Sequence, residues 1–238
     1  MKKICFLLVC TVLFSLLSCD NQQHDNKPDD TSVSETSSIT PPKPQILLPP
    51  SRVGHGTVYP TVVSKYKTLE GMFSICDAIA VVKIGNWLKE NDSFSYFEAS
   101  VLTCLYGKLP DNIVVYQLGT SKNTIPGTVI ASYGDELLMF LCSDEGKGAF
   151  ENSYFPAGVY CGSFDAILLG TEYVFVDRYS IILNSNLHLT NLFVNDEYKQ
   201  HIHSELKARY GTYAGQMKSY SAAYSVNELM SELLKAES

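Results

Sequence analysis

The sequence predicts a mainly β fold, a small antiparallel barrel or sandwich that one short helix precedes and further helices follow. Six apolar stretches are expected to be strands, beginning near residues 78, 94, 113, 136, 159 and 171. Glycine-bearing turns separate several of them and no helical pattern lies between them, which argues against a parallel α/β sheet. The stretch is about 120 residues long, which is enough to form one hydrophobic core.

The stretch Phe94–Tyr106 has the clearest strand pattern of the chain. Phe97 and Ala99 alternate with Glu98 and Ser100, so one set of side chains should enter the core while the other faces water. Aromatic residues also fall on the expected strands, at Trp87, Tyr96, Tyr106 and Tyr116. They either pack between the barrel and the helices or form a surface that stacks sugar rings or binds an extended peptide.

A short helix is expected just before the strands. Thr68 can cap this helix, because its hydroxyl can accept a hydrogen bond from a free amide of the first turn. The residues that follow repeat at helical spacing and would form one apolar face: Leu69, Met72, Phe73 and Cys76.

From about residue 186 the pattern becomes helical. Asn195 can cap a helix that stops at Gly211 and places an apolar or tyrosine residue at every fourth position: Tyr198, Ile202, Leu206 and Tyr210. Ser225 and Glu228 have the spacing of a capping box. They open a last helix whose apolar residues share one face: Val226, Leu229, Met230, Leu233 and Leu234. Four residues between these helices also fit a helical stripe: Tyr213, Met217, Tyr220 and Tyr224.

The first residues are typical of a signal for export. Lys2 and Lys3 precede the almost wholly apolar stretch Ile4–Ser18, whose 15 residues are short for a membrane-spanning helix. The stretch ends in the letters LLSC at Cys19, which resembles the bacterial lipobox. That resemblance implies a diacylglyceryl thioether on Cys19 and removal of the peptide before it. An ordinary secretory signal and an uncleaved anchor helix are the alternatives.

The chain therefore divides into four expected parts. Residues 1–18 form the lipoprotein signal peptide, and residues 19–58 contain the lipidated cysteine and a linker rich in Asp, Ser and Pro. This linker is too poor in apolar residues to fold and is expected to be disordered. Residues 59–185 form the β-barrel domain and residues 186–238 the C-terminal helical segment.

The charge of the chain argues against nucleic acid as a partner. The formal net charge is −7, and removal of residues 1–18 with Lys2 and Lys3 lowers it to −9. No run of lysines or arginines makes a local exception. An acidic protein gains no general electrostatic attraction to a phosphate backbone.

Four stretches are similar to segments of a group of uncharacterised exported proteins of Gram-positive bacteria. They read SICDAIAVVKIG, LTCLYGKLPDNIVVYQLG, YGDELLMFL and FPAGVYCGSFDAI. In that group a strand ends at a glycine before a second valine-rich strand. An acidic turn then precedes an aliphatic strand, and a glycine-containing segment follows. The resemblance covers roughly residues 65–178 and does not include the C-terminal helices.

The resemblance implies a small closed barrel of the OB or netrin type, which tissue inhibitors of metalloproteinases share. We therefore expect a mainly β fold with a small antiparallel OB-like barrel of about five to six strands, preceded by one short helix and followed by C-terminal helices. No site residues carry over. Those inhibitors chelate their target's metal with a free N-terminal cysteine beside the barrel. Cys19, in contrast, is expected to be lipidated and lies far from the barrel in the sequence.

Seven cysteines are present, of which Cys5 and Cys10 would leave with the signal peptide. Four remain in the folded region: Cys76, Cys104, Cys142 and Cys161. Their wide spacing fits no zinc pattern. Export permits disulfides, whose pairing the sequence does not define, while the apolar surroundings favour buried free thiols.

The sequence shows no constellation for catalysis, metal binding or a cofactor, and none of the three is expected. The histidines at positions 201 and 203 would point to different sides of a helix, so they cannot share a metal. No serine lies in a nucleophile motif, and Ser163 falls within an expected strand. Asp135 and Glu136 lie in a turn and are expected to be solvated.

These observations favour a membrane-anchored extracytoplasmic lipoprotein that acts as a non-enzymatic binding or interaction module of the cell envelope. Its expected location is the extracytoplasmic face of the cell membrane, where the lipid on Cys19 holds it. Its expected partner is an envelope protein or a cell-wall component. The alternatives are an envelope hydrolase and an inhibitor of exported proteases.

Overall fold

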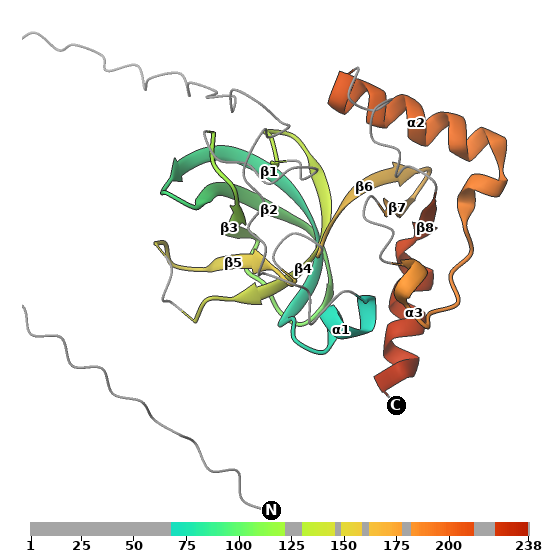
Figure 1. Ribbon diagram of the computed structural model, residues 1–238, viewed down its shortest axis with the longest axis horizontal. Helices are drawn as coiled ribbons and strands as arrows, with labels where there is room; N and C mark the ends of the chain where they lie inside the picture. The colour runs from blue at the N-terminus through green and yellow to red at the C-terminus, as the bar shows by residue number, and fades with distance from the viewer. Residues whose placement is uncertain are drawn as a thin grey trace, which may run out of the picture. The chain divides into compact units, whose positions relative to one another are not determined.

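The computed structural model describes residues 68–121, 130–145, 149–158, 162–177, 182–211 and 222–237, whose arrangement is drawn in Figure 1. The expected signal peptide, Cys19 and the linker lie outside the described residues. Within the described ranges, no helix has both the length and the apolar character needed to cross a bilayer.

Five strands close into a barrel in the order β1-β2-β3-β5-β4, and β4 pairs back onto β1. The strands are β1 (Ala78–Glu90), β2 (Phe94–Tyr106), β3 (Asn112–Leu118), β4 (Glu136–Ser143) and β5 (Ser153–Pro156). The predicted OB-like barrel is therefore confirmed. It is mixed rather than wholly antiparallel, because β3 and β5 run parallel.

This parallel pair follows from the number of strands. In a closed ring, strand direction can alternate throughout only when the number of strands is even. The other neighbouring pairs of this barrel are antiparallel, so the ring has to contain one parallel pair. It falls where Val114 and Val115 of β3 lie beside Ser153 and Tyr154 of β5.

Alternate side chains fill the barrel interior, as the sequence predicts for Phe97 and Ala99. Both are 1% exposed, whereas Glu98 and Ser100 face solvent. The strict alternation ends after Ser100, where β2 loses its partner β3. The buried interior consists of Ala80, Val82, Ile84, Phe97, Ala99, Ile113, Val115, Ile130, Ala131, Leu137, Met139 and Leu141.

The sheet continues beyond the barrel from the edge of β4. Its additional strands are β6 (Ser163–Leu169), β7 (Glu172–Val176) and β8 (Ala223–Ser225). The last of these comes from the C-terminal segment, so Tyr224 lies in a strand and not in the helical stripe that the sequence suggests. We call these three strands the extension.

Helices cover both faces of the extension (Figure 1). The helices α1 (Leu69–Phe73) and α3 (Val226–Glu237) pack against one face together with the outer sides of β1 and β4. The helix α2 (Asp196–Tyr210) packs against the other face. Two short 3-10 helices, η1 (Ile182–Asn184) and η2 (Leu192–Val194), lie in the connection between β7 and α2.

The helix boundaries agree with the predicted caps. The Thr68 hydroxyl accepts from the Gly71 amide at 3.0 Å, and the Asn195 side chain accepts from two amides of the first turn of α2. Gly211 ends α2 with φ of 60°, a conformation that favours glycine. Four of the five residues predicted to form the apolar face of α3 are buried, but Leu234 is 48% exposed.

Candidate functional site

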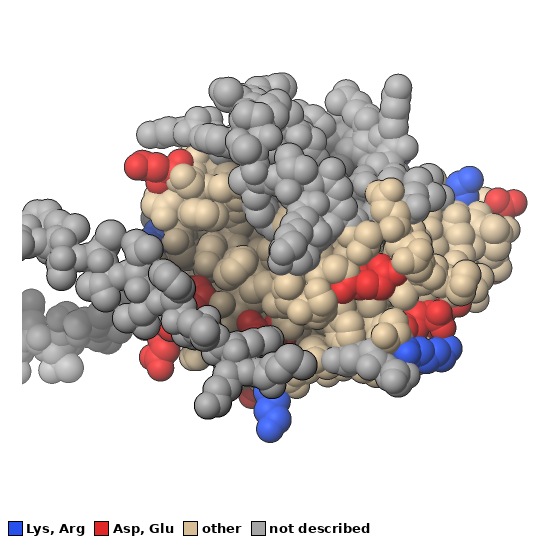
Figure 2. Space-filling model, turned by 60° about the horizontal axis from the view of Figure 1, so that its bottom comes forward, with Lys and Arg blue, Asp and Glu red and all other residues tan. Residues whose placement is uncertain are grey.

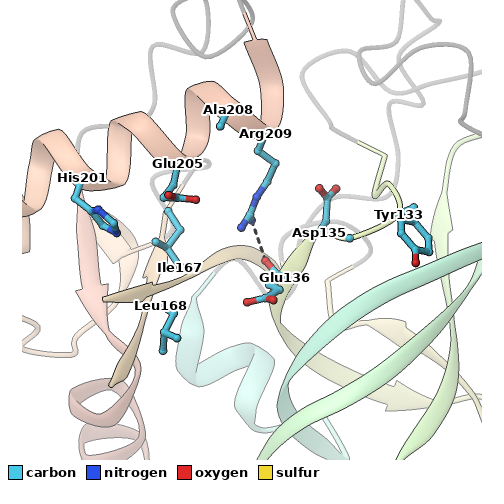
Figure 3. Close-up of a pocket in the computed structure, with 10 residues that line it drawn as sticks. Tyr133, Asp135, Glu136, Ile167, Leu168, His201, Glu205, Ala208 and Arg209 are labelled. Carbon is cyan, nitrogen blue, oxygen red and sulfur yellow. Dashed lines mark hydrogen bonds between the residues drawn. The ribbon is translucent and has the colours of Figure 1, made fainter. Parts of the chain in front are cut away.

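A groove with a volume of about 610 Å³ lies between α2, the turn that leads into β4, and the last residues of β6. We call it the helix groove. In Figure 3, His201, Glu205 and Arg209 project from α2, while Asp135 and Tyr133 lie toward the barrel. Its lining residues are Tyr133, Gly134, Asp135, Glu136, Ile167, Leu168, His201, Glu205, Ala208 and Arg209.

Arg209 joins α2 to the sheet. Its Nη1 donates to the Glu136 carbonyl at 3.0 Å and to Asp165 Oδ1 at 3.3 Å, and its Nη2 donates to the Ala166 carbonyl at 3.2 Å. The Tyr210 hydroxyl also donates to Asp165 Oδ1. Burial by itself would lower the pKa of the guanidinium, but the Asp165 carboxylate raises it above its ordinary value. Arg209 is therefore a structural cation that already has its anion.

The carboxylates of the helix groove have different surroundings. Asp135 is only 3% exposed and its Oδ2 accepts from the Ser132 amide at 2.8 Å, so the expectation of a solvated side chain was wrong for this residue. Glu136 accepts from Lys83 Nζ at 3.3 Å and from the Tyr173 hydroxyl at 3.3 Å. Glu205 is exposed.

The helix groove thus suits a positively charged ligand. Three carboxylates and one guanidinium line it. The guanidinium already pairs with Asp165 and Glu136 already pairs with Lys83, whereas the Glu205 carboxylate is exposed. Tyr133 is 53% exposed and Leu168 is 49% exposed, so the lining also offers surface on which an apolar stem could lie. On the face drawn in Figure 2, uncharged residues cover most of the described surface and acidic side chains appear in several separate places.

A second, smaller groove of about 360 Å³ lies on the outer side of β2 and β3. We call it the barrel groove. The Glu98 carboxylate accepts from Asn86 Nδ2 at 2.8 Å, and the Ser100 hydroxyl donates to Asn112 Oδ1 at 3.2 Å. The lining residues are Gly85, Glu98, Ala99, Ser100, Asn112, Ile113, Val114, Glu151 and Asn152.

Five aromatic rings lie next to the barrel groove and contact one another. Tyr96 and Tyr116 are cross-strand partners whose ring centroids are 5.2 Å apart. Burial, followed by the nearby Asp144 carboxylate, raises the pKa of Tyr116 to about 12. We call this set the aromatic cluster; its members are Phe94, Tyr96, Tyr116, Phe150 and Phe155.

The structure separates the four aromatic residues that the sequence places on strands. Tyr96 and Tyr116 belong to the aromatic cluster. Trp87 packs against the barrel interior, and the Tyr106 ring lies 4.8 Å from the Phe73 ring of α1. Tyr96 is buried and Tyr116 is partly buried, so internal packing holds for these residues, and an aromatic binding surface stays a prediction.

The described cysteines are free thiols, with Cys104 exposed and Cys142 buried. Cys161 lies outside the described residues, so a disulfide in this chain stays a prediction. Burial raises the pKa of Cys142 to about 11, and burial and the neighbouring Cys142 raise that of Cys76 to about 12. Such thiols are poor nucleophiles at neutral pH.

The two histidines of α2 face different surroundings, as their spacing predicts. His201 lines the helix groove, whereas the ring of His203 lies 5.2 Å from that of Phe193. In the part of the chain that the structure describes, no group of three His, Cys, Asp or Glu side chains could hold a metal ion. Ser163 opens β6 and therefore lies in a strand, as expected.

The sequence analysis did not single out Asp165, Glu205 or Arg209. Asp165 carried the one available signal, because an acidic residue inside an otherwise apolar strand usually has a buried partner. Comparison of the chain with protein-family models, with curated proteins and with solved structures found no match.

Proposed function

We propose that this chain is an exported lipoprotein, held at the extracytoplasmic face of the cell membrane by a lipid on Cys19. In this proposal it is one of the uncharacterised Gram-positive lipoproteins with a netrin-like barrel that its sequence resembles. The polar linker 19–58 would let the folded domain reach away from the bilayer. The domain acts as a non-enzymatic binding module of the envelope.

The observation that carries the binding role is the acidic helix groove. Its volume of about 610 Å³ is larger than a single amine needs, and it lies within the roughly 300–1,000 Å³ of typical ligand sites. The partner that fits is a segment of an envelope protein that carries lysine or arginine. The charged heads would face the exposed Glu205, while the aliphatic stems lie on Leu168 and Tyr133.

The hydrogen bonds of the groove support binding rather than hydrolysis. Glu136 accepts from Lys83 and Tyr173, and Asp135 accepts from a backbone amide. These two carboxylates are thus held by structural partners. An acidic groove also disfavours nucleic acid as a partner.

A peptide-binding measurement tests this role. The detergent-solubilised lipoprotein should bind a fluorescein-labelled lysine-rich peptide and not a glutamate-rich peptide of equal length. Added salt should weaken the binding, because the carboxylates are near the surface. Glu205→Gln should weaken it about two- to fivefold. Glu197→Gln, an exposed change on the same helix outside the groove, is the matched control.

The anchor has a separate test. Cys19→Ala should abolish incorporation of labelled fatty acid and leave either uncut precursor or released protein. Normal N-terminal processing together with unchanged partitioning into the membrane would contradict lipidation at this cysteine.

A further inference from the structure

We infer that the barrel groove is a second binding site and that it takes a neutral oligosaccharide. It shares no lining residue with the helix groove. The inference rests on three features: a set of polar groups that can pair with hydroxyls, partly exposed aromatic rings that adjoin the groove, and a shape that a glycine keeps open.

The polar groups have the pattern that sugar hydroxyls need. Each hydroxyl both donates and accepts, so a saccharide is best held by carboxylates and amides together. Within the described residues, Glu98 Oε1, Asn112 Nδ2 and the carboxylate of Glu151 have no hydrogen-bond partner. Glu98 Oε1 and the Glu151 carboxylate can accept from hydroxyls, and Asn112 Nδ2 can donate to one.

Internal hydrogen bonds fix two of these groups before a ligand arrives. Asn86 Nδ2 donates to Glu98 Oε2 at 2.8 Å, which leaves Oε1 available. The Ser100 hydroxyl donates to Asn112 Oδ1 at 3.2 Å, which orients the Asn112 amide with its nitrogen unused. Preordered partners reduce the entropy lost on binding.

The aromatic cluster continues the same face of the barrel. Glu98 pairs with Val114, and the pair Tyr96 and Tyr116 lies two residues along the same two strands. Side chains two residues apart on a strand share a face. Phe150, whose ring lies 5.6 Å from that of Tyr96, directly precedes Glu151. Tyr96 itself is buried, and Lys89 Nζ lies over the rings of Tyr96 and Phe150. Phe94, Tyr116 and Phe155 are partly exposed, and the C–H faces of a sugar ring can pack on them while its hydroxyls meet the polar groups.

Gly85 keeps the groove open. It lies where the register of β1 against β2 shifts, between Ile84 and Trp87. A Cβ at this position would come within 3.1 Å of the Glu98 Cβ and 3.3 Å of the Glu98 carbonyl oxygen. A side chain here would therefore push against the residue that the site uses.

Charge and size select the class of ligand. Two carboxylates without a cation in the lining disfavour anionic polymers. The amides of Asn112 and Asn152 and the Ser100 hydroxyl share this lining, and such groups can donate to and accept from the hydroxyls of a neutral ligand. The volume of about 360 Å³ falls at the lower end of the roughly 300–1,000 Å³ of ligand sites, which suits a short stretch of a glycan chain.

The test is calorimetric titration of the detergent-solubilised lipoprotein with two neutral probes, cellotetraose and N-acetylchitotetraose. We expect one of them to bind. Glu98→Gln and Asn112→Ala should each weaken that binding about five- to tenfold, the loss of one or two hydrogen bonds. Glu151→Gln changes an exposed loop residue and should weaken it without affecting folding. Glu205→Gln, in the helix groove, should leave it unchanged.

Two results would overturn the inference. One is that neither oligosaccharide binds while the lysine-rich peptide still does, which leaves the proposed function intact. The other is that an oligosaccharide binds with the same affinity to all three barrel-groove variants. Conversely, weakened peptide binding in Glu205→Gln with normal saccharide binding would support two sites that act separately.

Discussion

The barrel groove and the helix groove are built in different ways. The walls of the barrel groove come largely from adjacent strands, whose ladder pairs Glu98 with Val114 and Ser100 with Asn112. The helix groove is assembled from three segments that lie far apart in the sequence, and Arg209 supplies hydrogen bonds between them. A site on a ladder shares the stability of the barrel, whereas a site of this second kind depends on a few tertiary contacts.

The largest expected loss of stability is at α3, the helix that packs against both the barrel and the extension. Leu233 of α3 is fully buried in a cluster that includes outer residues of β1 and β4 as well as residues of β6 and β7. Leu233→Asp removes that contact and buries a charge, so we expect a loss of about 4 kcal/mol or more in the free energy of unfolding. Binding in both grooves should fall with it.

The neighbouring residue provides the control for this change. Leu234 is 48% exposed, so Leu234→Asp should leave the thermal midpoint almost unchanged. An equal loss in both variants, measured by thermal and urea unfolding, would contradict the packing of α3 on the sheet. An unshifted midpoint in Leu233→Asp would show that this face serves a partner and not the protein's own core.

The helix α3 is also the element that the sequence predicts best. Periodicity alone indicates the buried face of α3 and the caps of the helices, because capping and amphipathic packing depend on residues close in sequence. The strands that start near residues 78, 94 and 136 are likewise predicted from apolar patterns that are local in the sequence. Leu234 was placed wrongly, since helical spacing gives the centre of a buried face better than its edge.

The two shortest strands and the ion pair of the helix groove depend on contacts between residues far apart in the sequence, which local patterns do not reveal. The strand β5 has four residues and ends at Pro156, and β8 has three, so neither shows an alternating pattern. The parallel pairing of β5 with β3 follows from closure of the ring. The ion pair between Arg209 and Asp165 joins residues 44 positions apart, and only the tertiary structure brings them together.

A substitution of Arg209 should cost less stability than Leu233→Asp and should affect binding in only one of the two grooves. Arg209→Met leaves the fully buried Asp165 carboxylate without its cation, and we expect a loss of about 3 kcal/mol in the free energy of unfolding. Because α2 loses the Arg209 hydrogen bonds to β4 and β6, binding of the lysine-rich peptide should weaken strongly. Binding in the barrel groove should persist, since none of its lining residues contacts Arg209 in the described structure.

Two further variants test whether the loss of stability in Arg209→Met comes from its ion pair with Asp165. Lys207→Met removes an exposed cation from the same turn of α2 and should have little effect on stability. Adding Asp165→Asn to Arg209→Met should recover part of the loss, because the uncompensated charge disappears. If Arg209→Met abolished saccharide and peptide binding equally, the two grooves would not be independent units.

The smallest effect concerns the contact between α1 and the connection after β7, which lines neither groove. Glu70 accepts from the Ser185 hydroxyl and from the Asn186 amide, each at 2.7 Å. Burial by itself raises the pKa of Glu70, but these hydrogen bonds bring it below its usual value. A carboxyl whose pKa is lowered by folding stabilises the protein above its unfolded pKa, and this contribution disappears as the pH falls through the folded pKa.

Glu70→Gln should therefore cost about 1 kcal/mol at neutral pH, the size of hydrogen bonds to a half-buried group. The difference from the wild type should shrink at acidic pH below the usual pKa of a glutamate, as the wild-type carboxyl becomes protonated and loses the same advantage. Urea unfolding at the two pH values measures it, with Glu197→Gln as the exposed control. Binding in both grooves should remain normal at neutral pH, because Glu70 contacts neither lining. A cost that is the same at both pH values would mean that the carboxylate charge of Glu70 does not contribute to the contact.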